Sequence, residues 1–216
     1  MNRREFSTAA VCVLGTAALG FPALALAQKK PEEGTDYKTL GQRAAVETPQ
    51  GKVEVVEFFW YSCPHCNAFE PRLEAWSKNL PADVALRRVP VAFRDDFVPQ
   101  QRLFYTLEAM NRLGDLHARV FQTIHRERDP LNRDAAIFAW ADKHGLDKAK
   151  FQETYTSFSV TTKARRATQL QDAFKVEGVP ALGIAGRYYT DATLAGNMDR
   201  ALQVTEYLIA EARKSR

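Results

Sequence analysis

The sequence is poor in cysteine, with only three in 216 residues. Cys63 and Cys66 stand close together, and no second pair of cysteines is available to complete the four ligands of a structural zinc site. A c-type haem attachment site needs a histidine directly after the second cysteine, and Asn67 occupies that position. These absences argue against both kinds of site, and we expect neither a metal nor a cofactor.

The sequence also lacks a strong excess of charge of either sign. The chain has 30 basic and 26 acidic residues, which gives a formal net charge of +4. This excess is too small and too evenly mixed along the sequence to favour nucleic-acid binding.

Three histidines, His117, His125 and His144, are scattered without other ligand types around them. We expect them at the surface or hydrogen-bonded in the interior and not in a metal site.

A long apolar run occurs only near the N-terminus, from Ala9 to Leu26. The basic pair Arg3-Arg4 precedes it, and Ala25-Leu26-Ala27 at its end has the small-x-small form of a cleavage site. The sequence therefore predicts a cleaved signal peptide over residues 1–27, with a retained membrane anchor as the less favoured alternative. The arginine pair fits a general secretory signal and a twin-arginine signal equally well.

The mature chain is expected to begin with a flexible lead-in over residues 28–35 and to keep two cysteines, because Cys12 lies inside the signal peptide. A signal peptide implies an oxidising compartment, here the periplasm, where disulfides persist. A bridge between Cys63 and Cys66 would close a very short loop and would constrain the unfolded chain little. A purely structural disulfide is therefore disfavoured, and we interpret the pair as a redox reagent.

The two cysteines are expected at the junction of a strand and a helix. Residues 53–60 are rich in β-branched and aromatic side chains, which is typical of a buried strand. A helix is predicted from Pro64 to about Asn79, because Phe69, Leu73 and Trp76 are spaced for one buried face.

The helix start favours thiolate chemistry at Cys63. The unpaired N–H groups and the positive end of the helix dipole stabilise a thiolate, which is the nucleophile of disulfide exchange. His65 adds a second positive charge when it is protonated, and Pro64 suits the first helical turn, where its missing N–H costs nothing. Cys66, one turn into the helix, is placed to attack a mixed disulfide formed on Cys63.

These residues carry a resemblance to a known family. Cys63-Pro64-His65-Cys66 after Glu57-Phe58-Phe59 resembles the DsbA family of thioredoxin-fold thiol–disulfide oxidoreductases. Gly178-Val179-Pro180-Ala181 matches the cis-proline loop of that family, and the resemblance extends from about Thr39 to the C-terminal helix. It implies that Pro180 follows a cis bond, that this loop faces the cysteines, and that Val179 offers its backbone to a substrate strand.

Glu57 is a candidate buried acid. The apolar residues that follow it indicate that both faces of the strand are covered, and the DsbA family holds a buried acid at this distance before the first cysteine. Such a group could take or deliver the proton of Cys66. A buried carboxylate needs a partner, and Arg88 on the neighbouring predicted strand is our candidate. The family commonly has lysine near there, so this sequence departs from its pattern.

The fold that the resemblance implies is a thioredoxin-like α/β fold with an inserted all-helical domain. We expect the thioredoxin-like part at residues 36–93 and 168–216 and the insertion at residues 94–167. One apolar helical stripe is expected to stop at Gly114, and either Asn132 or Asp134 is expected to cap a later helix. Strands are also expected at residues 84–91, 181–184 and 187–190, and helices at residues 99–113, 116–124, 134–145, 148–155, 157–176 and 197–214.

The function that follows from the motif and the resemblance is oxidation of cysteine pairs in newly exported proteins through the Cys63–Cys66 disulfide. We expect a monomer that acts on reduced cysteine-containing exported proteins and is reoxidised by a membrane quinone-linked partner of the DsbB type. Two alternatives stay open. One is a periplasmic reductase or isomerase, although residues 28–36 are too few for the dimerisation module of a DsbC-type isomerase. The other is a peptide-binding chaperone in which the two cysteines are incidental.

Overall fold

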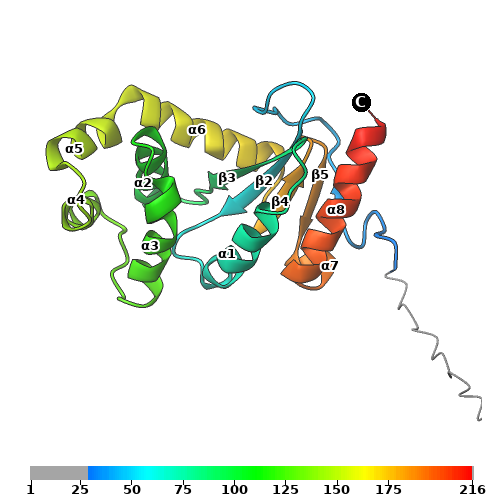
Figure 1. The fold of residues 1–216 in the computed structure, drawn as a ribbon, viewed down its shortest axis with the longest axis horizontal. Coiled ribbons are helices and arrows are strands. Elements are labelled where there is room, and N and C mark those ends of the chain that lie inside the picture. Colours follow the sequence, from blue (N-terminus) through cyan, green and yellow to red (C-terminus); the bar gives the residue numbers. More distant parts are fainter. Residues whose placement is uncertain (1–28, 216) are drawn as a thin grey trace, which may run out of the picture. The chain divides into compact units, whose positions relative to one another are not determined.

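The computed structural model describes residues 29–215. The predicted signal peptide and Cys12 lie outside the described residues. From Pro31 onward the chain forms one unit built on a five-stranded sheet of order β1-β5-β4-β2-β3 (Figure 1). Within the described range, none of the helices combines the length and the apolar character that a membrane crossing requires.

The last four strands agree with the expected segments to within one or two residues, and a short strand precedes them. They are β1 (Lys38–Thr39), β2 (Val53–Phe59), β3 (Val84–Pro90), β4 (Ala181–Ile184) and β5 (Tyr188–Asp191). The helices are α1 (Pro64–Ser77), the short 3-10 helix η1 (Asp95–Phe97), α2 (Val98–Ala109), α3 (Leu113–His125), α4 (Asp134–Lys143), α5 (Lys148–Thr156), α6 (Phe158–Ala173), α7 (Ala192–Ala195) and α8 (Met198–Lys214).

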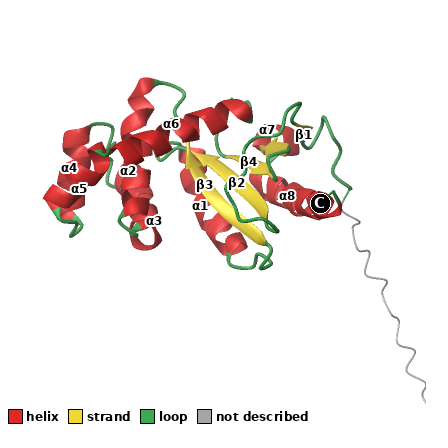
Figure 2. Ribbon diagram, turned by 90° about the horizontal axis from the view of Figure 1, so that it is seen from above, coloured by secondary structure: helices red, strands yellow, loops and turns green. Residues whose placement is uncertain are grey.

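Strand β2 lies inside the sheet and positions the site. It pairs parallel with β3 and antiparallel with β4, and all seven of its residues are buried. Val55 packs in the core with α1 and α8, whereas Phe58 packs on the other side of the sheet against Phe174 at the end of α6. Figure 2 shows these helices on opposite sides of the sheet. The expectation that both faces of this strand are covered is confirmed.

The chain between β3 and β4 is helical, as expected for the insertion. Helices α2 to α5 gather at one end of the sheet in both views (Figures 1 and 2). Helix α6 runs through the expected boundary at residue 168 and contacts both α2 and β3. One continuous helix therefore joins the two parts, and the division into domain and insertion stays a prediction.

Two local expectations are wrong. Gly114 does not end a helix: α2 ends at Ala109, and Gly114 lies in the first turn of α3. The turn between the two helices is made by Asn111, whose φ of 56° is left-handed, a conformation that asparagine tolerates. The expected cap of α4 is wrong as well. Arg133 occupies the N-cap position without a side-chain hydrogen bond, and the Asp134 carboxylate instead accepts the Tyr155 hydroxyl at 2.7 Å.

The hairpin between β4 and β5 is tighter than its sequence favours. Ala185 and Gly186 both have positive φ, 54° and 62°, and the Arg187 N–H donates to the Ile184 carbonyl at 2.9 Å. These are the features of a primed two-residue turn, with alanine in a position that usually holds asparagine, aspartate or glycine. The Asn197 side chain caps α8, because it accepts the Arg200 N–H at 2.8 Å.

Candidate active site

The first cysteine of the motif caps α1. Cys63 is the N-cap residue with extended backbone, and Pro64 follows as the first helical residue. The Cys66 N–H donates to the Cys63 sulfur at 3.4 Å, so the sulfur occupies the place that a capping oxygen takes in other helices. The predicted helix start is confirmed, and it sets the sulfur against the unpaired N–H groups of the first turn.

The two sulfurs have different surroundings. Pro64 and His65 are exposed between them, the Cys63 residue is 8% exposed and Cys66 is fully buried. The pKa of the Cys63 thiol is lowered to about 6, chiefly by a hydrogen bond from the Cys66 thiol. The backbone N–H groups of Cys66 and His65 and the charge of His65 act in the same direction, against burial. Burial raises the pKa of the Cys66 thiol, and both cysteines are free thiols in this structure.

The cis-proline loop lies against Cys63. The Val179-Pro180 bond is cis, and the Cys63 sulfur lies 3.3 Å from the Val179 carbonyl oxygen, to which the thiol donates. The two features that the resemblance placed together are thus in contact in the fold, across 116 positions of sequence.

A groove opens beside this contact, with a volume of about 1330 Å³. His65 of α1 and Val179 and Pro180 of the cis-proline loop are among the residues that line it. Further residues come from β1 and the segment after it, from α7 and from the start of α8, among them Leu40 and Met198. The Cys63 sulfur thus contacts a residue that lines the groove.

Glu57 is buried, as expected, with its residue 1% exposed. It stands opposite Arg88 in the parallel register of β2 and β3, and Arg88 Nε lies 3.4 Å from Glu57 Oε2. The predicted partner is therefore confirmed as the neighbour of the Glu57 carboxyl group, although Arg88 Nε makes no hydrogen bond to it. Burial, together with the nearby charge of Glu70, raises the pKa of Glu57 to about 8, and Arg88 offsets only part of this.

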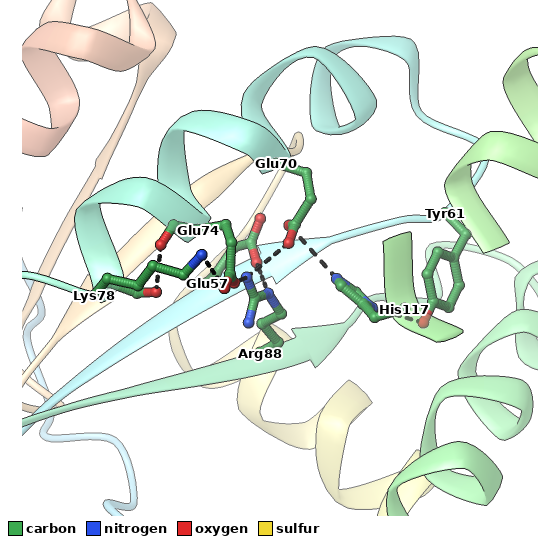
Figure 3. Close-up of polar contacts among 8 residues, drawn as sticks. Glu57, Tyr61, Glu70, Glu74, Lys78, Arg88 and His117 are labelled. Carbon is green, nitrogen blue, oxygen red and sulfur yellow. Dashed lines mark hydrogen bonds and ion pairs between the residues drawn. The ribbon is translucent and has the colours of Figure 1, made fainter. Parts of the chain in front are cut away.

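Arg88 contacts three carboxyl groups, and its contact with Glu57 is the longest of the three (Figure 3). The Arg88 guanidinium reaches Glu70 at 2.7 Å and Glu74 at 3.1 Å, both on α1. Burial by itself would raise the pKa of Glu70, but His117 and Arg88 hold it below its ordinary value. The negative charge of the buried cluster therefore resides on Glu70, and Glu57 is the member that keeps a proton near neutral pH.

Comparison with known proteins agrees with this geometry. A family model described as "DSBA-like thioredoxin domain" matches residues 54–203. The chain belongs to this DsbA-like family. It is 43% identical over 209 residues to the thiol:disulfide interchange protein DsbA of Bordetella pertussis, which covers 96% of this chain and 99% of the relative.

Solved structures give the same result. The crystal structure of Pseudomonas aeruginosa DsbA has a TM-score of 0.80 to this chain at 39% identity, covering 84% of this chain and 94% of the other. A crystal structure of a variant of that protein gives a TM-score of 0.83 at 38% identity, covering 86% of this chain and 100% of the other. This DsbA-like chain is therefore a protein thiol:disulfide oxidoreductase that introduces disulfide bonds, on a thioredoxin-like fold with a helical insertion.

Sequence reasoning missed three side chains of the DsbA-like site. Tyr61, Glu70 and His117 are buried, and they extend the cluster of Figure 3 toward the active-site loop. His117 Nδ1 lies 2.8 Å from the Tyr61 hydroxyl, and His117 Nε2 lies 3.5 Å from Glu70 Oε2. The only sequence signal for Glu70 is a carboxylate directly beside the apolar stripe of its helix. His117 likewise follows Leu116 on the apolar stripe of α3.

The histidines of the insertion have interior hydrogen bonds, in line with one of the two expected roles. His117 and His125 both contact Tyr61, and His144 Nδ1 lies 2.7 Å from the Trp140 carbonyl oxygen of its own helix. Among the residues that the structure describes, no three His, Cys, Asp or Glu side chains are grouped so that they could hold a metal ion.

Proposed function

We propose that Cys63 is the sulfur that exchanges disulfides with substrate proteins and that Cys66 is the buried sulfur that closes the bridge. The observation that carries this assignment is the difference between the two sulfurs. The Cys63 sulfur contacts Val179, which lines the groove, and its pKa is lowered to about 6, whereas Cys66 is fully buried and has its pKa raised. Disulfide exchange is fastest through the accessible sulfur that is the better leaving group.

The first step is attack by a substrate thiolate on the Cys63 sulfur of the Cys63–Cys66 disulfide. A bond forms between the substrate sulfur and Cys63, the bond between the two cysteines breaks, and Cys66 leaves with the electron pair. Because burial disfavours a thiolate at Cys66, this leaving group needs a proton. Glu57 keeps a proton near neutral pH and acts electrostatically on Cys66, so we assign it as the proton donor.

The second step frees the product. Another thiolate of the substrate attacks the substrate sulfur of the mixed disulfide, a disulfide forms within the substrate, and Cys63 leaves as a thiolate. The lowered pKa of Cys63 makes it a good leaving group. Two electrons pass from the substrate dithiol to the cysteine pair, which ends as two reduced side chains.

The neighbouring residues have supporting roles in this proposal. His65 contributes its backbone N–H and its charge to the Cys63 thiolate. Pro64 starts the helix at the residue where a missing N–H leaves no hydrogen bond unmade. Val179 offers its carbonyl beside the sulfur for a substrate strand, and Pro180 shapes the loop that presents it.

The reduced pair must be reoxidised before another turnover, so the protein needs a redox partner. Following the family resemblance, we propose a membrane quinone-linked partner of the DsbB type, and cysteine-containing exported proteins in the periplasm as substrates. The protein is proposed to act as a monomer, because Cys63, Cys66 and the groove beside them all lie in one chain.

Substituting each cysteine in turn tests which sulfur exchanges disulfides with substrates. Cys63→Ser should abolish oxidation of a reduced test protein, whereas Cys66→Ser should accumulate mixed disulfides through Cys63, detected by mass spectrometry of trapped complexes. The wild-type dithiol form, alkylated between pH 4 and 9, should be labelled at Cys63 first and with a midpoint near pH 6. Faster labelling of Cys66, or trapping through Cys66 in the Cys63→Ser variant, would reverse the assignment.

A further inference from the structure

Tyr61, two residues before Cys63, is held at both ends by histidines of α3. Its hydroxyl lies 2.8 Å from His117 Nδ1, and its backbone carbonyl oxygen lies 2.8 Å from His125 Nε2. The two histidines are eight positions apart on one helix of the insertion, and both are directed at this single residue of the active-site loop. Figure 3 shows the first of these contacts.

The directions of these hydrogen bonds follow from the groups involved. A carbonyl oxygen can only accept, so His125 Nε2 carries a proton and donates it. Burial raises the pKa of the Tyr61 hydroxyl, which is therefore neutral. His117 Nε2 faces Glu70 Oε2 at 3.5 Å and carries the proton of a neutral ring, since burial lowers the pKa of His117. His117 Nδ1 is then left to accept from the Tyr61 hydroxyl.

The loop that these contacts fix is the one that places Cys63. The Trp60 carbonyl accepts the Cys63 N–H at 3.0 Å, so residues 60–63 form a single turn that ends at the helix start. A shift of this turn would move the Cys63 sulfur away from the Cys66 N–H and thiol that stabilise its anion. Hydrogen bonds to a thiolate depend steeply on distance and angle, so a small displacement has a large effect.

We propose that Tyr61 is a positioning residue of the redox site, and that His117 and His125 fix it so that the helical insertion sets how strongly the Cys63 thiolate is stabilised. The inference rests on the proposed role of Cys63 as the exchanging sulfur. It assigns the insertion a part in the oxidising strength of the enzyme, in addition to any part it has in substrate binding.

Packing alone does not account for the arrangement. The Tyr61 ring lies among aromatic side chains of β2, α2 and α3, with centroid distances of 5.0 Å to Phe59 and 5.0 Å to Phe121. A phenylalanine at position 61 would make the same ring contacts, so these need no hydroxyl.

The charged groups that face His117 are Glu70 and Glu74 of α1 and Arg88 of β3.

The experiment compares four variants with the wild type. Tyr61→Phe removes the hydroxyl and keeps the ring, and His125→Leu removes the donor to the Tyr61 carbonyl. His125→Gln keeps an N–H donor at a similar reach. The matched control is His144→Leu, because His144 is a half-buried histidine of the same insertion that bonds to its own helix and to Arg119. Each protein is measured for the rate of Cys63 alkylation against pH, for its redox equilibrium with glutathione, and for urea unfolding.

Tyr61→Phe and His125→Leu should move the midpoint of Cys63 alkylation to higher pH. They should also weaken oxidation of glutathione by about tenfold in equilibrium constant, which is about 30 mV for a two-electron couple. His125→Gln should remain within about twofold of the wild type, because its amide can donate to the same carbonyl. His144→Leu should match the wild type in both measurements.

Variants that unfold at lower urea concentration, yet keep the wild-type alkylation midpoint and glutathione equilibrium, would show that Tyr61 has only a packing role and would overturn the inference. An equal shift in His144→Leu would overturn it too, because the effect would then not pass through Tyr61. If the wild-type Cys63 itself reacted like an ordinary thiol, the proposed function would fail, and the inference would fail with it.

Discussion

The Cys63 sulfur lies 3.3 Å from the carbonyl oxygen of Val179, although 116 positions separate the two residues. In the thiol form this carbonyl accepts the Cys63 S–H. When the sulfur is bonded to another sulfur, the S–H is gone and the carbonyl is free to accept an N–H from a substrate. Main-chain pairing of this kind recognises an extended peptide regardless of its side chains, which suits an enzyme whose substrates are proteins.

A peptide substrate that loses this N–H should react more slowly. Methylating the backbone nitrogen of the residue next to the substrate cysteine should lower the rate of mixed-disulfide formation about three- to tenfold, the loss of one net hydrogen bond. The rate is measured by stopped-flow tryptophan fluorescence with the oxidised protein. A peptide methylated two residues farther along is the control, and equal slowing of both peptides would argue against pairing with Val179.

The reduced protein should be more stable than the oxidised protein at neutral pH. The pKa of Cys63 falls from an ordinary value near 9 to about 6 on folding. A depressed pKa gives stability that is fully present above the unfolded value and is lost as pH falls through the folded one. At pH 7 it amounts to roughly 1.4 kcal/mol. The oxidised form has no thiolate, and its short bridge stabilises little.

Parallel urea unfolding of the two redox forms between pH 4 and 9 measures this difference, which should shrink to nearly nothing by pH 5. The hydrogen bond from the Cys66 thiol is the main cause of the lowered pKa, and the charge of His65 is a smaller one. His65→Ala should therefore reduce the difference in unfolding free energy between the reduced and oxidised forms only in part. Equal stability of the two forms at pH 7 would contradict the thiolate as the source of oxidising power.

Replacing Glu57 should affect activity and stability in opposite directions. Its pKa is raised to about 8, so the stability associated with its protonated form is lost as pH rises through that value. Glu57→Gln has nothing to ionise, and Arg88 keeps Glu70 and Glu74 as partners. At pH 9 the variant should be more stable than the wild type by about 1–3 kcal/mol.

The same variant cannot give a proton to Cys66, so its turnover at pH 7 should fall about tenfold or more. Turnover is followed as oxidation of a fluorescent dithiol peptide, and stability by urea unfolding at pH 6 and pH 9. A variant less stable than the wild type at pH 9 would show that the ionised pair with Arg88 stabilises the fold.

Gly183 should tolerate no side chain. A Cβ atom there would overlap the buried ring of Phe174, whose Cζ would lie only 2.8 Å away. Gly183→Ala should destabilise the protein by about 1–3 kcal/mol, and Phe174→Leu in the same chain should recover part of the loss. Gly114→Ala is the matched control, because no atom beyond its chain neighbours and the backbone of its own helix lies within 4 Å of its Cβ position, and alanine favours a helix. It should be neutral or stabilising, and a similar loss at both glycines would exclude the clash as the cause.

Local sequence was enough to predict the helix start at Cys63, because capping and proline placement depend on a few adjacent residues. The pairing of Glu57 with Arg88 needed only two neighbouring strands in the right order. The contact between Cys63 and Val179 came from the resemblance to a family and not from any pattern in the chain. The spacing of residues along the sequence alone does not predict which two loops of a fold come into contact.

The missed parts of the site are long-range pairs. Tyr61 and His117 are 56 positions apart, and each taken alone has the pattern of an ordinary core residue. The error at Gly114 has a related cause. Glycine often ends a helix, but Asn111 had already made the turn three residues earlier. The packing of α2 against α3 decides whether the chain turns at Asn111 or at Gly114. The sequence of the turn alone carries no information about that packing.

The strand order has a consequence for synthesis. β4 lies between β2 and β5, and β1 pairs with β5, so the sheet is complete only when the segment from Ala181 to Asp191 has emerged. Until then β2, apolar on both faces, has an open edge that can pair with other chains. A protein that introduces disulfide bonds into other chains thus passes through an unprotected interval of its own, and any helper that covers β2 during synthesis would act before this enzyme can.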